Sequence, residues 1–451
     1  MLRVLAVGLC LWLSAPVLAQ SVKGVPLKAG VAKVDITPPP GVPMWGYARR
    51  KGTATGTLDP LLARVLVLEA GSKRLALVTL DLGRPFGPAS LEQLRSAAGK
   101  SSGISYVFVT ASHTHSGPVV LDEYASGRPA WEAAALDKIA KAIEEAAGRL
   151  AEARLGTGKG TTYIGHNRLR QNPDGTVTWF ERNPTLVPTS PFDPTVSVLR
   201  IDGADGQPMA ILVNYATHPV VFGPDNLQYS ADFPGAMVRT VEKAFGAQPI
   251  CFFLQGAPGD INALYAVTPL EQDAVKMCEW SGRHLGEEAV RVAKAIPTES
   301  AEATLDYSED ILRFHLRWDP EKFRQGLIAI FGQKASEEFA PSIKQELQLP
   351  VSTVLINKRI AILGMPGEPF VDFQIDWRAR CPVPDAFLVG YANGYHGYFP
   401  TIRACSLAGY GAAGVTTWVE PGAGERMVIH GLVKMYEMLG KLTNVPVGTD
   451  F

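Results

Sequence analysis

Short runs of hydrophobic residues alternate with helix-like segments along most of this chain of 451 residues. Runs rich in β-branched and aromatic residues are typical of buried strands. They occupy residues 61–69, 75–82, 106–110, 196–201, 210–215, 250–254, 351–363 and 387–391. Hydrophobic positions three or four apart predict helices at 90–98, 131–150, 234–245, 270–296 and 425–439. This alternation predicts an α/β fold in which mixed β-sheets are flanked by helices.

The first 19 residues form a segment of a different kind. One basic residue, an apolar run and small residues at 17 and 19 are the layout of a signal peptide. We therefore expect cleavage near Ala19 and a secreted or periplasmic protein. No later stretch has the roughly 20 apolar residues of a transmembrane anchor, which leaves only transient contact with a membrane surface open.

The remaining residues, 20–451, are expected to form a single large catalytic domain. Their number exceeds the roughly 250–300 residues usual for one core, so two lobes are the alternative, but no repeat or linker divides them. A formal net charge of -1 gives no reason to expect a nucleic acid partner. An exported protein can form disulfides. Four cysteines follow the signal peptide, and Cys381 with Cys405 is the pair we would test first: Cys251, Cys278, Cys381 and Cys405.

Polar residues suited to metal binding stand where several predicted strands end. His113 and His115 follow one strand, and residues i and i+2 of a strand share a face. His218 follows a second strand and Glu368 a third. Three imidazoles and a carboxylate are suitable zinc ligands, although a histidine at a strand end is often only a packing residue. The pattern therefore predicts a metal site that these four residues share.

Two further segments carry groups that could act beside a metal. Asp260, in LQGAPGDINAL, follows a Gly-rich turn, and either presents its carboxylate to the metal or hydrogen-bonds its own backbone. Arg168, in IGHNRLR, either grips a substrate carbonyl or is a solvated surface charge.

At these residues the sequence resembles the catalytic domain of the neutral, non-lysosomal ceramidases. The matching segments, in the family's order, are AGVAKVDITPP, SHTHSGP, NYATHPV, APGDIN, MPGE and the Asn-x-Tyr-x-x-Tyr pattern from Asn393 to Tyr398. SHTHSGP is the most specific of them. The immunoglobulin-like domain that follows the catalytic domain in full-length ceramidases has no counterpart before Phe451.

The resemblance implies a specific set of roles. One zinc ion per chain would be held by His113, His218, Glu368 and Tyr398, and His115 would face the substrate's carbonyl oxygen instead of binding zinc. Arg168 would orient the substrate, and Asp260 matches the family's aspartate. Asn262 stands where the family has an active-site serine. Its amide can hydrogen-bond a substrate but cannot be a nucleophile, which puts ceramide itself in question.

The sequence thus predicts a zinc-dependent hydrolase that cleaves the N-acyl amide bond of ceramide or of a related lipid-like substrate. His115 and Asp260 are both candidates for the general base. One alternative is the same metal site acting on another N-acyl or ester substrate. A second is a non-catalytic exported metal-binding protein. A two-metal phosphoesterase would need more carboxylate ligands than the sequence offers.

Overall fold

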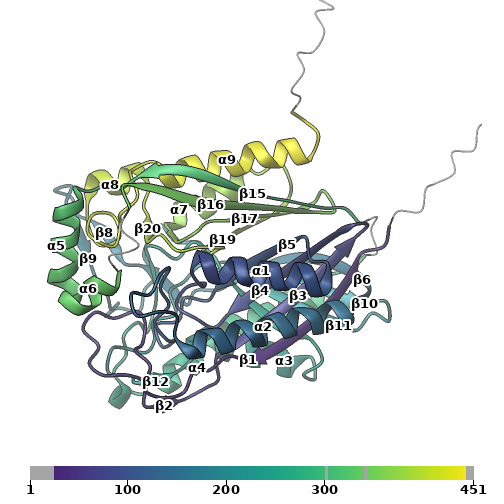
Figure 1. Ribbon diagram of the computed structural model, residues 1–451, viewed down its shortest axis with the longest axis horizontal. Coiled ribbons are helices and arrows are strands. Elements are labelled where there is room, and N and C mark those ends of the chain that lie inside the picture. The colour runs from purple at the N-terminus through teal and green to yellow at the C-terminus, as the bar shows by residue number, and fades with distance from the viewer. Residues whose placement is uncertain (1–24, 300–302, 340–343, 443–451) are drawn as a thin grey trace, which may run out of the picture.

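Two mixed β-sheets form the centre of the protein (Figure 1). The computed structural model describes residues 25–299, 303–339 and 344–442, so the expected signal peptide lies outside the described residues. The eight-stranded sheet runs in the order β13 (Ile250–Gln255), β11 (Pro208–Tyr215), β10 (Thr195–Gly203), β6 (Ala151–Thr161), β1 (Lys28–Asp35), β3 (Leu62–Ala70), β4 (Lys73–Leu80) and β5 (Tyr106–Ala111). The four-stranded sheet runs β15 (Leu305–His315), β16 (Glu346–Ile356), β17 (Ile360–Gly364) and β19 (Asp385–Val389).

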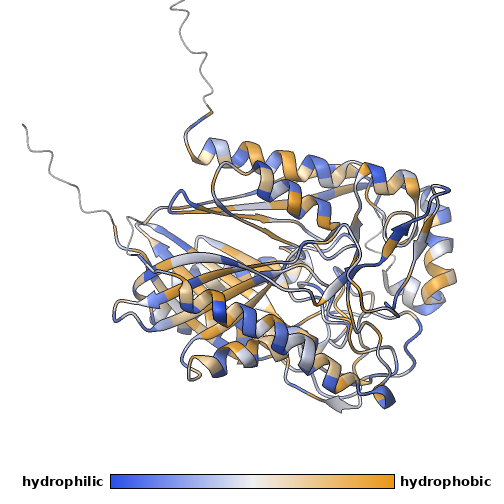
Figure 2. Ribbon diagram, turned by 180° about the vertical axis from the view of Figure 1, so that it is seen from behind, coloured by the Kyte–Doolittle hydropathy of each residue, from blue (hydrophilic) through white to orange (hydrophobic). Residues whose placement is uncertain are grey.

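The two sheets pack face to face, and helices cover their outer faces (Figure 1). The sequence of strand β3 is hydrophobic on both faces, which fits a position between the second sheet and the helices. Successive side chains of a strand point to opposite faces. Leu66 and Leu68 belong to the core between the sheets, whereas Val65 and Val67 pack under the outer helices. Figure 2 shows the consequence: the strands are largely hydrophobic and the covering helices carry hydrophilic positions.

Separate groups of helices cover the two sheets. Residues of α1 (Pro88–Ser102) and α2 (Ala130–Gly148) share one core with the large sheet, and those of α3 (Asp232–Ala244) and α4 (Ala274–Ala295) share another. α7 (Val371–Arg380) and α9 (Ala423–Met438) share a core with the small sheet. The remaining helical elements are η1 (Leu270–Gln272), α5 (Pro320–Phe331), α6 (Gln333–Phe339) and α8 (Ile402–Leu407). No helix of the described part is long and apolar enough to cross a membrane.

Short strand pairs connect the loops that leave the two sheets. These are β2 (Gly56–Thr57) with β12 (Gln228–Tyr229), β7 (Gly165–Asn167) with β14 (Ile261–Ala263), β8 (Leu169–Gln171) with β9 (Val177–Trp179), and β18 (Glu368–Pro369) with β20 (Tyr398–Phe399). The pair β18–β20 is parallel and sets Glu368 beside Tyr398. Residues far apart in the sequence therefore meet at one end of the sheets.

The predicted α/β class is confirmed, with differences in detail. The expected run 351–363 is an antiparallel hairpin, because Asn357 and Lys358 take positive φ angles and reverse the chain between β16 and β17. The disulfide expected first, Cys381 with Cys405, is wrong: both thiols are free, as are the buried thiols of Cys251 and Cys278. Cys381 follows α7, and Cys405 lies within α8, where its neighbour is the Arg317 guanidinium.

Candidate metal centre

His113 and His115 lie in a turn after β5 and approach each other closely. The strand ends at Ala111, and His113 has a left-handed backbone with φ 69°. The expectation that a shared strand face aligns the two rings is therefore wrong, since the turn brings them together. Their Nε2 atoms are 3.1 Å apart. The predicted convergence of the two imidazoles is nevertheless present.

His218 and Glu368 complete a compact buried cluster with these histidines. One ring nitrogen from each of His113, His115 and His218 lies within 4.8 Å of the other two. Glu368 Oε2 is 3.0 Å from His218 Nε2 and 3.6 Å from His113 Nε2. The His residues follow strands of the large sheet, whereas Glu368 follows β17 of the small sheet. The centre therefore lies where the two sheets meet.

The hydrogen bonds of this cluster favour a bound cation. His113 Nδ1 is 2.6 Å from the Gly83 carbonyl, and His218 Nδ1 is 2.6 Å from the Pro258 carbonyl. A neutral imidazole that donates from Nδ1 has a lone pair on Nε2. The Nε2 lone pairs of His113 and His218 then both face Glu368 Oε2, which is also a hydrogen-bond acceptor, so no proton lies between them. A metal ion between them removes that conflict, and such carbonyl contacts commonly orient metal-binding histidines.

Burial sets the protonation of these groups. It lowers the pKa of His113 to about 4, and it lowers the pKa of His218 as well. The pKa of His115 falls well below its usual value because of burial and then the charges of His113 and His218. Burial alone would raise the pKa of Glu368, but His113 and His218 hold it at about 2. Neutral imidazoles and an ionised carboxylate are the forms that bind metal.

Tyr398 and Arg168 form the next layer of the centre. Arg168 Nη2 donates to the Tyr398 hydroxyl at 2.9 Å, and the Tyr398 ring stacks 6.3 Å from that of His218. Burial raises the pKa of the Tyr398 hydroxyl, an effect that the Arg168 charge opposes. Arg168 is itself almost fully buried, and its Nη2 also donates to the Gly259 carbonyl at 2.6 Å. The interpretation of Arg168 as a solvated surface charge is wrong.

Asp260 and Asn262 have their hydrogen-bonding groups occupied by the protein. Asp260 Oδ1 accepts from the Val371 amide at 2.8 Å and Oδ2 from Asn167 Nδ2 at 2.7 Å. Burial raises the pKa of this carboxyl to about 6. Asn262 Oδ1 accepts from Arg168 at 3.0 Å, and its Nδ2 donates to the Glu181 carbonyl at 2.9 Å. Both residues thus brace the loops around the cluster.

Three tyrosines contact the centre without having been assigned a role from the sequence. Tyr395 donates to Glu368 Oε1 at 2.6 Å, and the Tyr391 ring stacks on His113 with centroids 4.2 Å apart. The Arg168 guanidinium lies 5.0 Å from the Tyr410 ring. Their clustering between 391 and 410 is visible in the sequence, but spacing alone does not reveal which partner each one meets.

Most of the chain matches a known protein family. Residues 27–346 match the model of the neutral/alkaline non-lysosomal ceramidase family, N-terminal region. The chain belongs to this ceramidase family. The matched range includes the three histidines, and Glu368 and Tyr398 lie beyond its end.

Curated ceramidases and solved ceramidase structures resemble the chain to different extents. The chain is 30% identical to the neutral ceramidase of Pseudomonas aeruginosa over 229 residues, which is 46% of this chain. It is 28% identical to the neutral ceramidase of Mycobacterium tuberculosis over 245 residues, which is 49% of this chain. These alignments span only 33% and 37% of the two relatives. A solved "Ceramidase complexed with C2" superposes with a TM-score of 0.74 at 19% identity, covering 94% of this chain and 77% of the other. The crystal structure of the neutral ceramidase from Pseudomonas aeruginosa superposes with a TM-score of 0.74 at 20% sequence identity. It covers 94% of this chain and 76% of the other. At this identity the superpositions establish the shared ceramidase fold.

Proposed function

We propose that the chain is an exported zinc-dependent hydrolase that cleaves the N-acyl amide bond of ceramide or a related N-acyl lipid. The observation that carries the proposal is the buried convergence of His113, His218 and Glu368, whose acceptor atoms face one another. These three residues would hold one zinc ion, with the Tyr398 oxygen as the fourth ligand. Zinc in this position would polarise an acyl carbonyl and lower the pKa of water towards neutrality.

His115 is the better supported general base. Its ring lies directly beside the metal-binding residues, with its Nε2 atom 3.1 Å from that of His113. Its lowered pKa keeps the ring unprotonated at neutral pH, as a base must be. Asp260 is less suited, because its two oxygens already accept hydrogen bonds from Val371 and Asn167. We assign Asp260 the role of holding α7 and β7 together.

Arg168 is suited to stabilising negative charge that develops on a substrate oxygen. Its guanidinium keeps its charge, because Tyr398 and Tyr410 offset the effect of burial on its pKa. Its contact with the Tyr398 hydroxyl fixes it beside the cluster. Removal of one such donor typically lowers kcat by about 10²–10³-fold.

A screen for hydrolysis tests the proposal. The purified protein is offered ceramides, other N-acyl lipids and esters, with and without a chelator, and His113→Ala serves as the inactive variant. We expect chelator-sensitive release of fatty acid from an N-acyl lipid and about one zinc per chain. Turnover of esters alone would favour the alternative substrate class. Zinc binding without any turnover would favour the non-catalytic alternative and contradict our proposal.

Export is proposed from the sequence of residues 1–19. Expression with the native leader, followed by N-terminal sequencing of protein from outside the cytoplasm, tests it. We expect the mature chain to begin close to Gln20. An uncleaved chain retained in the cytoplasm would contradict export and leave the hydrolase proposal intact.

A further inference from the structure

The segment from Gly390 to Tyr398, which follows β19 and ends at the first residue of β20, supplies several side chains that contact the centre. It carries Tyr391 against His113 and Tyr395 against Glu368. Tyr391 and Asn393 both have positive φ angles, 51° and 52°. A left-handed backbone costs a residue other than glycine about 1–2 kcal/mol, less for Asn. Such a conformation persists only where surrounding contacts enforce it.

Asn393 makes the contacts that hold this segment against β5. Its backbone amide donates to the Val109 carbonyl at 2.8 Å, and its side-chain Oδ1 accepts from the Val109 amide at 2.7 Å. Thr110 adds a hydrogen bond from its hydroxyl to the Gly390 carbonyl at 2.9 Å. Since β5 leads directly to His113, these bonds fix the register between the two chain segments that reach the centre.

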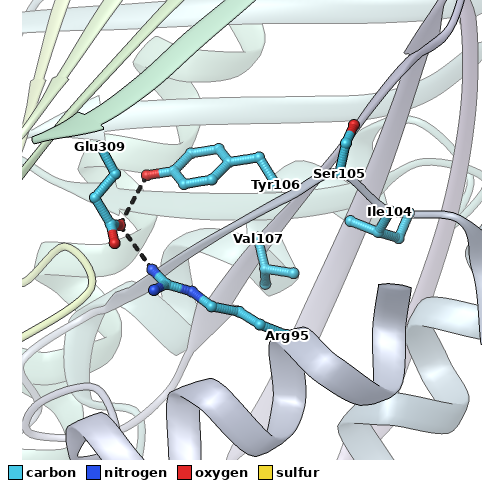
Figure 3. Close-up of a pocket in the computed structure, with 6 residues that line it drawn as sticks. All are labelled: Arg95, Ile104, Ser105, Tyr106, Val107 and Glu309. Atoms are coloured by element: carbon cyan, nitrogen blue, oxygen red, sulfur yellow. Dashed lines mark hydrogen bonds and ion pairs between the residues drawn. The ribbon is translucent and has the colours of Figure 1, made fainter. Parts of the chain in front are cut away.

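The Asn393 side chain is anchored in turn by Glu309 of β15. Asn393 Nδ2 donates to Glu309 Oε2 at 2.6 Å. The same oxygen accepts from Arg95 of α1 at 2.6 Å and from the Tyr106 hydroxyl of β5 at 3.1 Å. Figure 3 shows Arg95 and Tyr106 directed at Glu309 from two sides. One carboxylate oxygen thus links α1, both sheets and the segment 390–398.

A cavity of about 200 Å³ adjoins this carboxylate (Figure 3). Its lining residues are Arg95, Ile104, Ser105, Tyr106, Val107 and Glu309. Room beside the Glu309 side chain means that dense packing does not hold the carboxylate in place there. Its position depends on the hydrogen bonds from Arg95, Tyr106 and Asn393, with a longer one from the Ser352 hydroxyl at 3.5 Å.

We propose that Glu309, acting through Asn393, is a positioning residue for the metal centre. It holds the segment 390–398 so that Tyr395 meets Glu368 and Tyr391 meets His113. The effect of this anchoring on zinc binding rests on the function proposed above. The anchoring of the segment does not, because it follows from contacts that require no metal.

The variant Glu309→Gln tests the proposal because it removes the charge and keeps the size of the side chain. Glu69→Gln is the matched control: Glu69 is also a largely buried glutamate of a sheet that pairs with an arginine, Arg74, and a second cation, Lys28. Two readouts are taken on each variant. Hydrogen exchange of the metal-free protein reports on the amides of 390–398, and competition with a chelator reports on zinc affinity.

We expect Glu309→Gln to speed exchange of the Tyr391 and Asn393 amides about tenfold, the effect of losing one charged hydrogen bond. Zinc affinity should fall about tenfold, as for other changes behind metal ligands. Glu69→Gln should alter both by less than about twofold. Unchanged exchange, or faster exchange with unchanged zinc affinity, overturns the proposal.

The experiment distinguishes a failure of the proposed zinc-dependent function from a failure of the proposed role of Glu309. A wild-type protein that binds no zinc would refute the zinc site, and exchange alone would then decide whether Glu309 anchors the segment. If Glu309→Gln does not fold, Tyr106→Phe replaces it with the same expectations. That change removes only a hydroxyl, which contacts Glu309, Asn393 and Ser352.

Discussion

The hydroxyl of Tyr395 donates a 2.6 Å hydrogen bond to Glu368 Oε1, while the other oxygen of the same carboxylate faces His218. Tyr395 therefore fixes which oxygen of Glu368 points into the centre. We expect Tyr395→Phe to lower zinc affinity about 10–100-fold, because a carboxylate without this donor is free to rotate. Chelator competition measures the change.

Tyr124→Phe is a suitable control for that experiment. Tyr124 also donates to a buried glutamate, Glu132, at 2.5 Å, but outside the centre. The Tyr124→Phe protein should have a lower free energy of unfolding than the wild type and the same zinc affinity. Equal affinities of Tyr395→Phe and the wild type would refute the role assigned to Tyr395.

Arg168→Lys should lower kcat about 10²–10³-fold with a smaller change in KM. Lysine keeps the charge, but its single nitrogen cannot replace the two guanidinium nitrogens from which Arg168 donates to Asn262, Gly259 and Tyr398. Steady-state kinetics on the best substrate of the screen provide the measurement. Arg64→Lys, which alters a buried arginine paired with Asp81 at 2.8 Å, should affect stability and spare kcat. A similar loss of kcat in both variants would show that Arg168 acts only through folding.

Asn262→Ser should shift selectivity towards ceramide. The shorter side chain releases the Glu181 carbonyl and one Arg168 nitrogen, both of which Asn262 now occupies. The ratio of kcat/KM for ceramide to that for other N-acyl lipids should rise about tenfold, which is typical for one small group in a pocket. A ratio that stays constant would mean that position 262 does not select the substrate.

Asp232 should make stability depend on pH. Burial raises its pKa from 3.8 to about 7, so the folded protein binds the proton more tightly than the unfolded chain does. The stability that the protonated Asp232 carboxyl contributes to the folded protein is fully present below about pH 4. It is lost as the pH rises through about 7, because the carboxyl then ionises in the folded protein. Relative to Asp232→Asn, which cannot ionise, the wild type should lose up to about 4 kcal/mol of unfolding free energy over that range.

Urea unfolding of the metal-free protein at pH 4.5, 6 and 7.5 tests this difference. Asp205→Asn, at an exposed turn, is the control and should follow the wild type. Parallel curves for the wild type and Asp232→Asn would contradict the raised pKa.

Local patterns predicted most of the elements that carry the centre, because buried strands and amphipathic helices have distinct periods. They missed β15, whose sequence LDYSEDILRFH lacks regular alternation, since as the outermost strand of its sheet it is only partly buried. They also missed β6, where the glycines at 156, 158 and 160 leave room for α4 and the residues just after it, and remove the hydrophobic signal.

The histidines of the centre were predictable from the strand ends, whereas the contacts of Tyr398 and Tyr395 were not. Tyr398 was nominated only by the family resemblance, because no local rule marks a tyrosine as a metal ligand. The bond from Tyr395 to Glu368 depends on the turn between β19 and β20, and two left-handed residues in that turn, Tyr391 and Asn393, have no signature in a hydrophobic pattern. The occupied amide of Asn262 likewise became apparent only from its three-dimensional neighbours.

The division of the centre between the two sheets has a practical consequence. A fragment that ended before β15 would retain His113, His115 and His218 but lack Glu368 and Tyr398. Tight zinc binding would then serve as a test of whether the second sheet has docked correctly on the first. Purification of variants by their zinc content would select natively assembled molecules without any assay for turnover.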